Sequence, residues 1–296
     1  MGVLSRLAVL ITDKVVFVEL QKTGSTHIKN LLQETLGGKN DGKHNVPTAE
    51  LLKSGREFLG SVRDPWGWYL SLWSYGCQQQ GKLYQRLINP KRWERVQPKL
   101  IEARKAQKEK VRSLAAGRGP KKWKPIMIPD KLGVERAKNF YYSDPANAEA
   151  FREWLRLVCS PYARRLLEDG FARSPISKLG GLMTFRYFNL FVPGSDNIPP
   201  TINTHKMLRA YEADRVAVKH IVRQHTLADD LVHALDSCKI VLTDKQREKI
   251  YKAKPTNKST RPHPFAHYYD VTSIDVVAKR EKFIIDRFGY ERPNVA

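Results

Sequence analysis

The stretch VVFVELQKTGSTHIKNLLQETL, residues 15–36, decides the fold. Its first part, Val15 to Leu20, is an apolar run typical of a buried strand, and its last part, His27 to Leu36, has the periodicity of a helix. Between them QKTGST, Gln21 to Thr26, brings small and hydroxyl residues to the point where the helix begins. A strand that runs through a tight turn into a helix predicts an α/β fold.

This first junction has the features of an anion-binding site. The first N–H groups of a helix lack intrahelical partners, and the helix dipole is positive at the same end. Gly24 lets the main chain approach a phosphate, Lys22 adds a full charge, and Ser25 and Thr26 add hydroxyl donors. A turn with a helix cap explains the same residues without a ligand, so both interpretations stay open.

A second junction of the same kind follows about forty residues later. EFLGSV, Glu57 to Val62, is strand-like, and RDPWGWYLSLWSYG after it predicts a turn with Asp64 as a helix cap. Arg63 and Ser71 can converge if the helix folds back over the strand end. Two junctions, each with a cation and a hydroxyl, indicate a ligand with two separated anionic groups. The alternative is a surface ion pair between Arg63 and Asp64.

Together these residues resemble the PAPS-dependent sulfotransferases, which use 3′-phosphoadenosine 5′-phosphosulfate (PAPS) as donor. QKTGSTHIKNLL resembles the family's 5′-phosphosulfate loop, Pro-Lys-x-Gly-(Ser/Thr)-Thr, with Gln21 in place of proline. SVRDPWGWYLSLWSY resembles its 3′-phosphate motif.

Two later segments extend the resemblance. RVAVKHIVRQHTLADDLVHAL (residues 215–235) is similar to a late strand and helix of the family, although His225 stands where an acidic residue is common. NKSTRPHPFAHYYD (residues 257–270) resembles the C-terminal segment of carbohydrate-type and bacterial members. The resemblance covers both ends of the chain and little of its middle.

The resemblance implies a fold class and a domain organisation. We expect an α/β fold with a P-loop-NTPase-like central parallel sheet flanked by helices. Residues 1–296 would form a single sulfotransferase domain, and a basic helical insertion at approximately 82–190 would bind the acceptor.

The resemblance also assigns roles to individual residues. Lys22 would contact the bridge between 5′-phosphate and sulfate, backbone amides and hydroxyls of the loop would hold the 5′-phosphate, and His27 would lie against adenine. Arg63 and Ser71 would hold the 3′-phosphate, with two later cations closing over it. No metal is expected, and the product would be adenosine 3′,5′-bisphosphate (PAP). The full set of expected PAPS contacts is Lys22, Thr23, Gly24, Ser25, Thr26, His27, Arg63, Ser71, Lys258 and Arg261.

The resemblance implies in-line transfer of the sulfuryl group from PAPS to a hydroxyl of an acceptor. This transfer needs a base that takes the hydroxyl proton, and His44 is the favoured candidate among eight histidines. It precedes Arg63 by nineteen residues, which resembles the spacing of the catalytic histidine in many sulfotransferases. An imidazole accepts a proton near neutral pH. A solvated loop histidine is the alternative, and Glu19 or Glu50 would then supply the base.

The net charge of +22 is spread unevenly. Between residues 82 and 124 only Glu94, Glu102 and Glu109 are acidic. This composition predicts a basic helix from Lys91 to Ala116 and a KKWKP loop after it, suited to capture of an acidic acceptor or an anionic membrane surface. A solvated insertion that aids solubility is the alternative. The cations of the stretch are Lys82, Arg86, Lys91, Arg92, Arg95, Lys99, Arg104, Lys105, Lys108, Lys110, Arg112, Arg118, Lys121, Lys122 and Lys124.

The remaining chain predicts further helices. Residues 146–167 have a helical pattern, and a closing helix is expected from Ser273 to Phe288, ending at Gly289. The aromatic residues of the 180–191 segment would build either an acceptor pocket or plain core; they are Phe185, Tyr187, Phe188 and Phe191. Three pairs resemble capping boxes: Thr226 with Asp229, Thr243 with Gln246, and Thr272 with Asp275.

Composition narrows the location and the competing functions. No apolar run approaches the length of a membrane span, and the N-terminus matches neither a signal peptide nor a myristoylation site. Three widely spaced cysteines are expected to be reduced. We therefore expect a cytoplasmic protein, either free or peripheral to a membrane, acting on a hydroxyl-bearing acceptor such as a glycan or glycolipid, with a small metabolite as the next choice. The oligomeric state stays open.

Two other function classes are weighed. A P-loop kinase explains the first junction, but GxxxxGK[ST] is absent and Lys22 precedes the glycine. A nucleic-acid-binding protein explains the charge, yet only Trp93 and Trp123 could stack on bases within the basic stretch. No nucleic-acid partner is expected.

Overall fold

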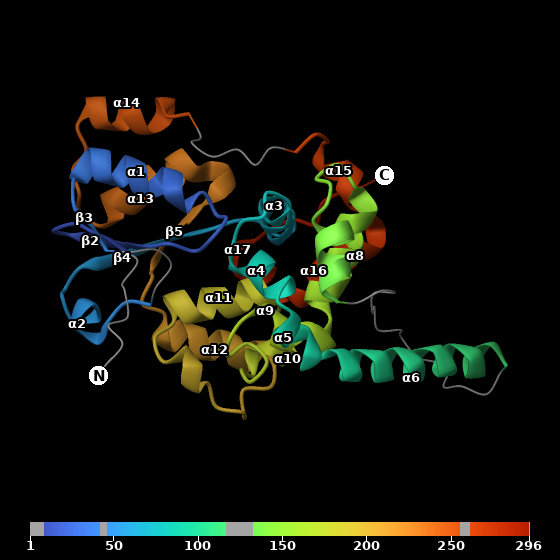
Figure 1. Ribbon diagram of the computed structural model, residues 1–296. Coiled ribbons are helices and arrows are strands. Elements are labelled where there is room, and N and C mark those ends of the chain that lie inside the picture. Colours follow the sequence, from blue (N-terminus) through green and yellow to red (C-terminus); the bar gives the residue numbers. More distant parts are fainter. Residues whose placement is uncertain (1–8, 42–45, 117–132, 255–260, 296) are drawn as a thin grey trace. The chain divides into compact units, whose positions relative to one another are not determined.

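The computed structural model describes residues 9–41, 46–116, 133–254 and 261–295. It is an α/β structure with a five-stranded mixed sheet and many helices (Figure 1). The chain divides into two compact units. The first consists of Met1–Trp68 and Met183–Lys258, and the second of Tyr69–Leu182 and Ser259–Ala296. Each unit is described by itself.

The sheet belongs to the first unit and has the strand order β3-β1-β2-β4-β5. The strands β2, β4 and β5 are parallel, whereas β1 is antiparallel to both β2 and β3. A three-residue connection joins β1 to β2, and so short a link permits only antiparallel pairing. The expected parallel sheet is therefore present in three strands, and the other two make it mixed. The strands are β1 (Val9–Ile11), β2 (Val15–Val18), β3 (Lys39–Asp41), β4 (Glu57–Val62) and β5 (His220–Arg223).

Helices cover both faces of this sheet, as expected. On one face the apolar sides of three helices pack on strand residues such as Phe17 and Leu59. On the other face Gly60 lies under α11, where an added Cβ would come within 2.6 Å of the Phe191 ring. The helices of the first unit are α1 (Ser25–Leu36), α2 (Ala49–Leu52), α12 (His205–Arg215), α13 (Leu227–Ser237) and α14 (Asp244–Lys252), together with α11 (Leu182–Phe191), which belongs to this unit from Met183 on. The unit also contains the 3₁₀ turns η3 (Ser195–Asn197) and η4 (Gln224–Thr226).

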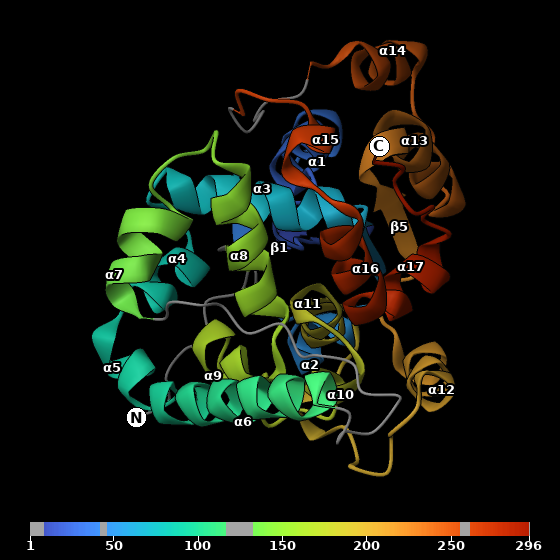
Figure 2. The same cartoon turned by 90° about the vertical axis from the view of Figure 1, so that its right-hand side faces the viewer.

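The second unit is helical in its described residues. Buried indole and phenol groups hydrogen-bond within it: Trp73 Nε1 donates to the Tyr141 carbonyl at 2.5 Å, and Trp154 Nε1 donates to the Tyr142 hydroxyl at 2.6 Å. Figure 2 shows α8 beside α15 and α16. The unit's helices are α4 (Lys82–Leu87), α5 (Pro90–Glu94), α6 (Gln97–Ala115), α7 (Val134–Arg136), η1 (Ala137–Tyr141), α8 (Ala148–Cys159), η2 (Pro161–Ala163), α9 (Arg164–Leu167), α10 (Ile176–Leu179), α15 (Phe265–Tyr268), α16 (Val271–Arg280) and α17 (Lys282–Phe288); α3 (Pro65–Cys77) begins in the first unit and ends in the second.

Three helices predicted as continuous are broken. The basic helix is split into α5 and α6, because Pro98 lacks an N–H and occupies the first turn of α6. The 146–167 segment stops at Cys159, since Ser160 is extended and Pro161 follows it. The closing helix is divided at Glu281, which is fully buried. Its end at Gly289 is confirmed, with φ at 66°.

The predicted capping boxes are confirmed in one case of three. Thr243 and Gln246 form the reciprocal pair that opens α14. Thr226 precedes α13 without a side-chain cap, because that end of the helix follows a 3₁₀ turn. The box at α16 is formed by Asp270 and Ser273 instead of Thr272 and Asp275, so this helix begins two residues earlier than predicted.

The aromatic residues of α11 belong to the core. Phe185, Tyr187, Phe188 and Phe191 are all buried, and the Tyr187 hydroxyl donates to Glu212 Oε1 on α12 at 2.5 Å. The core interpretation of these rings is confirmed, and they do not line an open acceptor pocket. The cysteines Cys77, Cys159 and Cys238 are free thiols.

Candidate functional site

Three strand ends meet at one edge of the first unit's sheet. Because β2, β4 and β5 are parallel, their carboxyl ends lie on the same side, with Val18 opposite Gly60 and Val62 opposite Arg223. The chain continues from these ends into α1, α3 and η4. Ligands of open α/β sheets bind beyond the carboxyl ends of the strands. The candidate site is therefore built from the three segments that leave this edge.

The loop after β2 has an unusual backbone conformation. Lys22 has φ at 65° and Gly24 has φ at 82°. Glycine adopts this left-handed region readily, whereas a non-glycine residue there costs on the order of 1–3 kcal/mol. Such strain is common at binding and catalytic sites. The loop holds Lys22 in a conformation that its own preference does not favour.

The start of α1 directs backbone amides out of the helix. The amide of Ile28 donates to the Gly24 carbonyl at 3.1 Å, so Ser25, Thr26 and His27 precede the first intrahelical bond. Within this helix no side chain caps the N-terminus, and the first turn contains no acidic residue. Helix ends of this kind favour an anion through both N–H groups and dipole.

Hydrogen bonds from neighbouring elements fix the loop. The Thr23 hydroxyl donates to the Leu20 carbonyl at 2.6 Å and lies 2.6 Å from Ser61 Oγ on β4. Trp68 Nε1 donates to the Gln21 carbonyl at 2.7 Å. Thr23 and Ser61 are fully buried, so the Thr23 side chain is structural and only its backbone could contact a ligand.

A positive group from the second strand end lies near this loop. Burial, and after it the positive charge of Arg63, lower the pKa of Lys22 to about 8. Arg63 immediately follows β4, its side chain is 18% exposed, and its Nε lies 3.7 Å from Asp64 Oδ2. Two cations are thus close enough to repel each other at adjacent strand ends. An anionic ligand would relieve this repulsion.

Asp64 and Gly67 shape the second junction. The Gly67 amide donates to Asp64 Oδ1 at 2.5 Å, which confirms the predicted cap of α3. A Cβ on Gly67 would lie 2.5 Å from Asp64 Oδ2 and 3.0 Å from Arg63 Nε. The absence of a side chain at Gly67 therefore leaves room for both Asp64 and Arg63.

The third junction carries its own counter-charge. Arg223, at the end of β5, donates from Nε and Nη2 to the two carboxylate oxygens of Asp230 at 2.8 and 2.9 Å, and its backbone amide donates to Oδ2 at 2.8 Å. Partial burial alone would raise the pKa of Asp230, but the hydrogen bonds from Arg223 hold it below its ordinary value. This segment borders the loop, since a Cβ on Gly24 would contact Gln224 and Leu227 at 3.6 and 3.5 Å.

A buried ion pair lies beside the loop. Glu19, directly after β2, is 1% exposed and has Oε1 3.3 Å from Lys29 Nζ on α1. Glu50, the other alternative base, is exposed in the first turn of α2. His44, the favoured base, lies outside the described residues, so its role stays a prediction.

Three further residues predicted to contact PAPS lie at the start of α1, and one lies outside the described residues. Ser25 is buried and Thr26 half-buried at the start of α1. His27 is half-buried, and burial lowers its pKa against the opposing influence of Glu34. Lys258 lies outside the described residues.

Two predicted contacts for the 3′-phosphate belong to the second unit. Ser71 is buried within α3, and Arg261 is half-buried near the start of the C-terminal segment. Lys22 and Arg63 belong to the first unit. The structure brings Lys22, Arg63 and the start of α1 together, while the convergence of Ser71 and Arg261 with them stays a prediction.

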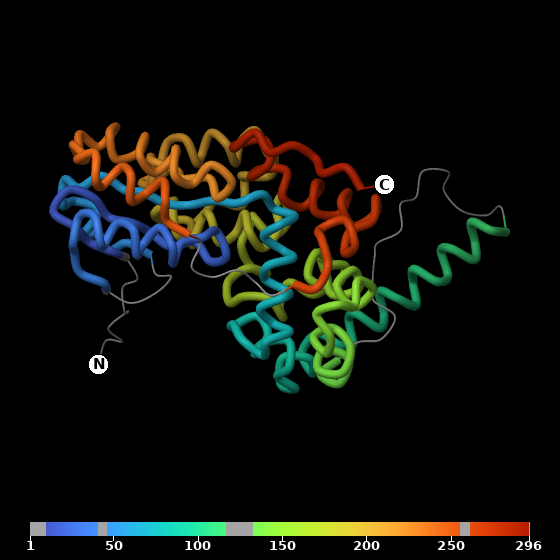
Figure 3. The backbone as a smooth tube through the Cα atoms, turned by 90° about the horizontal axis from the view of Figure 1, so that it is seen from above, coloured from blue at the N-terminus to red at the C-terminus, as the bar shows by residue number. Residues whose placement is uncertain are grey.

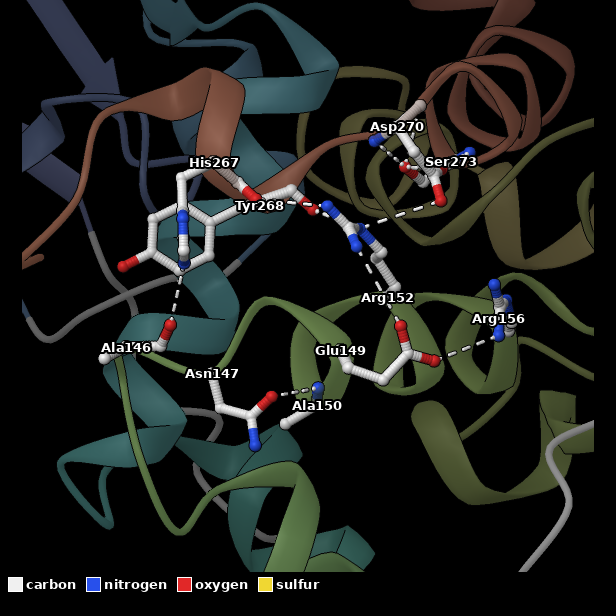
Figure 4. A network of polar contacts seen from close by, with 10 residues as sticks. All are labelled: Ala146, Asn147, Glu149, Ala150, Arg152, Arg156, His267, Tyr268, Asp270 and Ser273. Atoms are coloured by element: carbon white, nitrogen blue, oxygen red, sulfur yellow. Dashed lines mark hydrogen bonds and ion pairs between the residues drawn. The ribbon is translucent and has the colours of Figure 1, made fainter.

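The segment after Arg261 is anchored to α8 within the second unit (Figure 4). Arg152 donates to the carbonyls of Tyr268 and His267 at 3.0 and 3.1 Å and lies 3.7 Å from Asp270. His267 Nε2 is 3.0 Å from the Ala146 carbonyl oxygen. Arg152 therefore fixes the chain just before α16, whose first turn Asp270 caps.

Sequence reasoning missed four residues that support the site. Ser61, Gly67 and Trp68 hold the two junctions through the contacts described above. Arg186 on α11 is 5% exposed, and its guanidinium carbon lies 5.5 Å from the centre of the Trp68 ring. An arginine inside an aromatic helical segment is the one signal that the sequence offered for this last contact, since buried arginine is rare without a partner.

Compared with protein-family models, curated proteins and solved structures, the chain matches none. In the described part of the chain, no helix has the length and apolar character needed to cross a bilayer. Among the same residues, no cluster of His, Cys, Asp and Glu could hold a metal ion.

Proposed function

We propose that this protein is a PAPS-dependent sulfotransferase that transfers a sulfuryl group to an acceptor hydroxyl. The observation that carries the proposal is the pair Lys22 and Arg63. They lie at the ends of the adjacent parallel strands β2 and β4, close enough that the charge of Arg63 lowers the pKa of Lys22. PAPS has a 5′-phosphosulfate and a separate 3′-phosphate, and each would meet one of these cations.

The first junction suits the 5′-phosphosulfate. Its backbone amides point out of the N-terminus of α1, and Lys22 lies beside them in the strained loop. In the transfer, the acceptor oxygen attacks sulfur, the S–O bond to the 5′-phosphate breaks, and PAP leaves with the extra negative charge. Lys22 would stabilise this charge, and its interaction would strengthen as the bond breaks. The acceptor proton would go to a base, for which His44 stays the favoured candidate.

Arg63 suits the 3′-phosphate because a guanidinium can donate two parallel hydrogen bonds to a phosphate. The room left by Gly67 places its Nε close to the carboxylate that caps α3. The strand β2, its loop and helix α1, together with Arg63 between β4 and α3, support a P-loop-NTPase-like sheet as the finer fold class. A carbohydrate or glycolipid hydroxyl is the acceptor that the C-terminal resemblance favours.

Thermal unfolding with two nucleotides tests the proposal. PAP at about 100 times its Kd is expected to stabilise the protein by about 2.7 kcal/mol. AMP, which lacks only the 3′-phosphate, should stabilise it less. Arg63→Ala should remove the difference between PAP and AMP, whereas Arg215→Ala, at an exposed arginine of the same unit, should preserve it. Equal stabilisation of the wild-type protein by PAP and AMP would contradict the assigned 3′-phosphate site.

A transfer assay completes the test. Sulfur-labelled PAPS incubated with hydroxylated glycans, glycolipids and phenols should yield a labelled acceptor in at least one class. A protein that binds PAP with the expected preference but transfers to no acceptor in this panel would bind the nucleotide without the proposed activity on these classes.

A further inference from the structure

The helix α6 is an exposed basic element of the second unit. It spans nineteen residues, Gln97–Ala115, of which Leu100 is the buried one. Figure 3 shows its C-terminal half extending beyond the other described helices of its unit. Most of its surface therefore faces solvent, and its charge pattern is not explained by packing.

Three cations of α6 form one row, here called the basic stripe: Lys105, Lys108 and Arg112. Their spacings of three and four residues place them on one face of a helix. All three are exposed. At about 1.5 Å of rise per residue they follow one another at roughly 4.5 and 6 Å along the axis.

The stripe is neutralised only in part by acidic residues of its own helix. Like charges three and four residues apart destabilise a helix, and Glu102 and Glu109, three or four residues from Lys105 and Arg112, offset part of that cost. Glu102 and Glu109, the acidic residues of α6, lie along one flank of the stripe and leave its other flank without an acidic residue of this helix. A row of regularly spaced positive charges is complementary to a partner whose negative charges also lie in a row.

The chemistry around the stripe narrows the class of partner. The α6 sequence contains no aromatic residue, and Trp93 is buried with its indole N–H donated to the Leu87 carbonyl at 2.6 Å. A stacking platform for the bases of a single strand is therefore not present on this helix. A lipid-binding helix would expose an apolar face opposite its basic one. Leu100 is fully buried in protein, and the two exposed apolar residues of α6, Ile101 and Val111, lie on or beside the face of the basic stripe and not opposite it.

We propose that the basic stripe of α6 binds a linear acidic polysaccharide along the helix. This inference rests on the proposed function, because such a chain carries both the negative charges that match the stripe and the hydroxyl groups that a sulfotransferase would modify. The inference therefore specifies an acceptor that already carries negative charges before it is sulfated.

Binding of fluorescently labelled oligogalacturonate, a linear sugar chain with one carboxylate per residue, tests the inference with the full-length protein. The double variant Lys105→Gln, Lys108→Gln removes two charges from the stripe. The matched control Lys99→Gln, Lys110→Gln removes two exposed charges from roughly the opposite side of the same helix. Glutamine and lysine have similar helix propensities, so circular dichroism should be unchanged in both variants.

We expect the stripe variant to weaken binding about tenfold at low salt and to reduce the salt dependence of the affinity, because fewer counterions are exchanged. The control variant should stay within about twofold of the wild type, since its charges lie off the contact. Equal weakening by both variants would overturn the inference in favour of diffuse attraction. Tighter, stripe-dependent binding of duplex DNA or of anionic phospholipid vesicles would overturn it in favour of another partner.

The binding test uses no nucleotide and is therefore independent of the donor site. Absence of oligogalacturonate binding, with PAP stabilisation intact, would overturn this inference and leave the proposed function standing. Stripe-dependent binding without PAP stabilisation would support the stripe and count against the sulfotransferase proposal.

Discussion

The hydroxyl oxygens of Thr23 and Ser61 lie 2.6 Å apart, and both side chains are fully buried. This contact joins the loop after β2 to the neighbouring strand β4, 38 residues away in the sequence. It links the loop that holds Lys22 to the strand that ends at Arg63. The relative positions of the two cations therefore depend in part on this hydrogen bond.

The first prediction concerns Ser61→Ala. Thr23 keeps its bond to the Leu20 carbonyl, so the loss should be about 1 kcal/mol of unfolding free energy. PAP binding should weaken as well, because the loop is less firmly held. The control Ser237→Ala removes an exposed hydroxyl that bonds the His233 carbonyl and should change neither quantity measurably. Denaturant unfolding and PAP titration check both; unchanged PAP affinity in Ser61→Ala would deny the loop contact a role in binding.

The second prediction follows from the pKa of about 8 at Lys22. Below that pH the amine is already charged, and an anion binds without proton uptake. Above it, binding must reprotonate Lys22, so PAP affinity should fall by up to about tenfold per pH unit. Calorimetric titration at pH 7 and pH 9 should thus show roughly tenfold weaker binding at the higher pH.

Lys22→Arg is the matched control for this pH dependence. A guanidinium stays charged across this range, so the variant should bind PAP with nearly the same affinity at both pH values. The free protein gives a second readout: because the folded pKa of Lys22 is lowered, the unfolded chain binds more protons above pH 8, and wild-type stability should gain there from this group. Wild-type PAP affinity that is equal at pH 7 and pH 9 would place Lys22 away from the bound phosphates.

The third prediction concerns Gly67→Ala. The added methyl group would collide with Asp64 and press on Arg63 Nε, so Arg63 should be displaced. Affinity for PAP should fall by about tenfold, or roughly 1.4 kcal/mol, while AMP binding should change little. Asp64→Ala removes the cap but leaves room for Arg63, so it should cost about 1 kcal/mol of stability and preserve the preference for PAP. Loss of that preference in both variants would make the cap, and not the space at Gly67, responsible.

The sequence predicted the parts of the fold whose signals are local. The bounds of β4, the cap at Asp64 and the stop at Gly289 all follow from a few adjacent residues. The strands β1 and β3 have only three residues each, and their pairing is determined by contacts with distant strands. The breaks in the long helices were missed because helical periodicity continues across residues 95–96 and across Glu281, although the helical backbone does not.

The candidate site was predictable in its chemistry but less so in its geometry. The cations and the small residues at the two junctions are visible in the sequence, since they adjoin apolar strand runs. The left-handed backbone of Lys22 and the contact of Trp68 with Gln21 depend on packing of elements that are far apart in the chain. The buried pair of Glu19 and Lys29 likewise has no signal in the sequence, because helical phase alone does not show which strand-end residue Lys29 faces.

The last prediction asks whether Glu19 is structural or catalytic. Glu19→Gln leaves Lys29 buried without its carboxylate and should cost about 3 kcal/mol of stability. Adding Lys29→Met should recover most of the loss, since the remaining charge is also removed. As a control, Glu34→Gln breaks an exposed ion pair with Lys249 and should cost at most about 0.5 kcal/mol. Denaturant unfolding measures these changes, and turnover of the double variant decides the role. Recovered stability with near-normal turnover makes the pair structural and leaves His44 as the base, whereas recovered stability with PAP binding intact and turnover about 100-fold lower would make Glu19 the base.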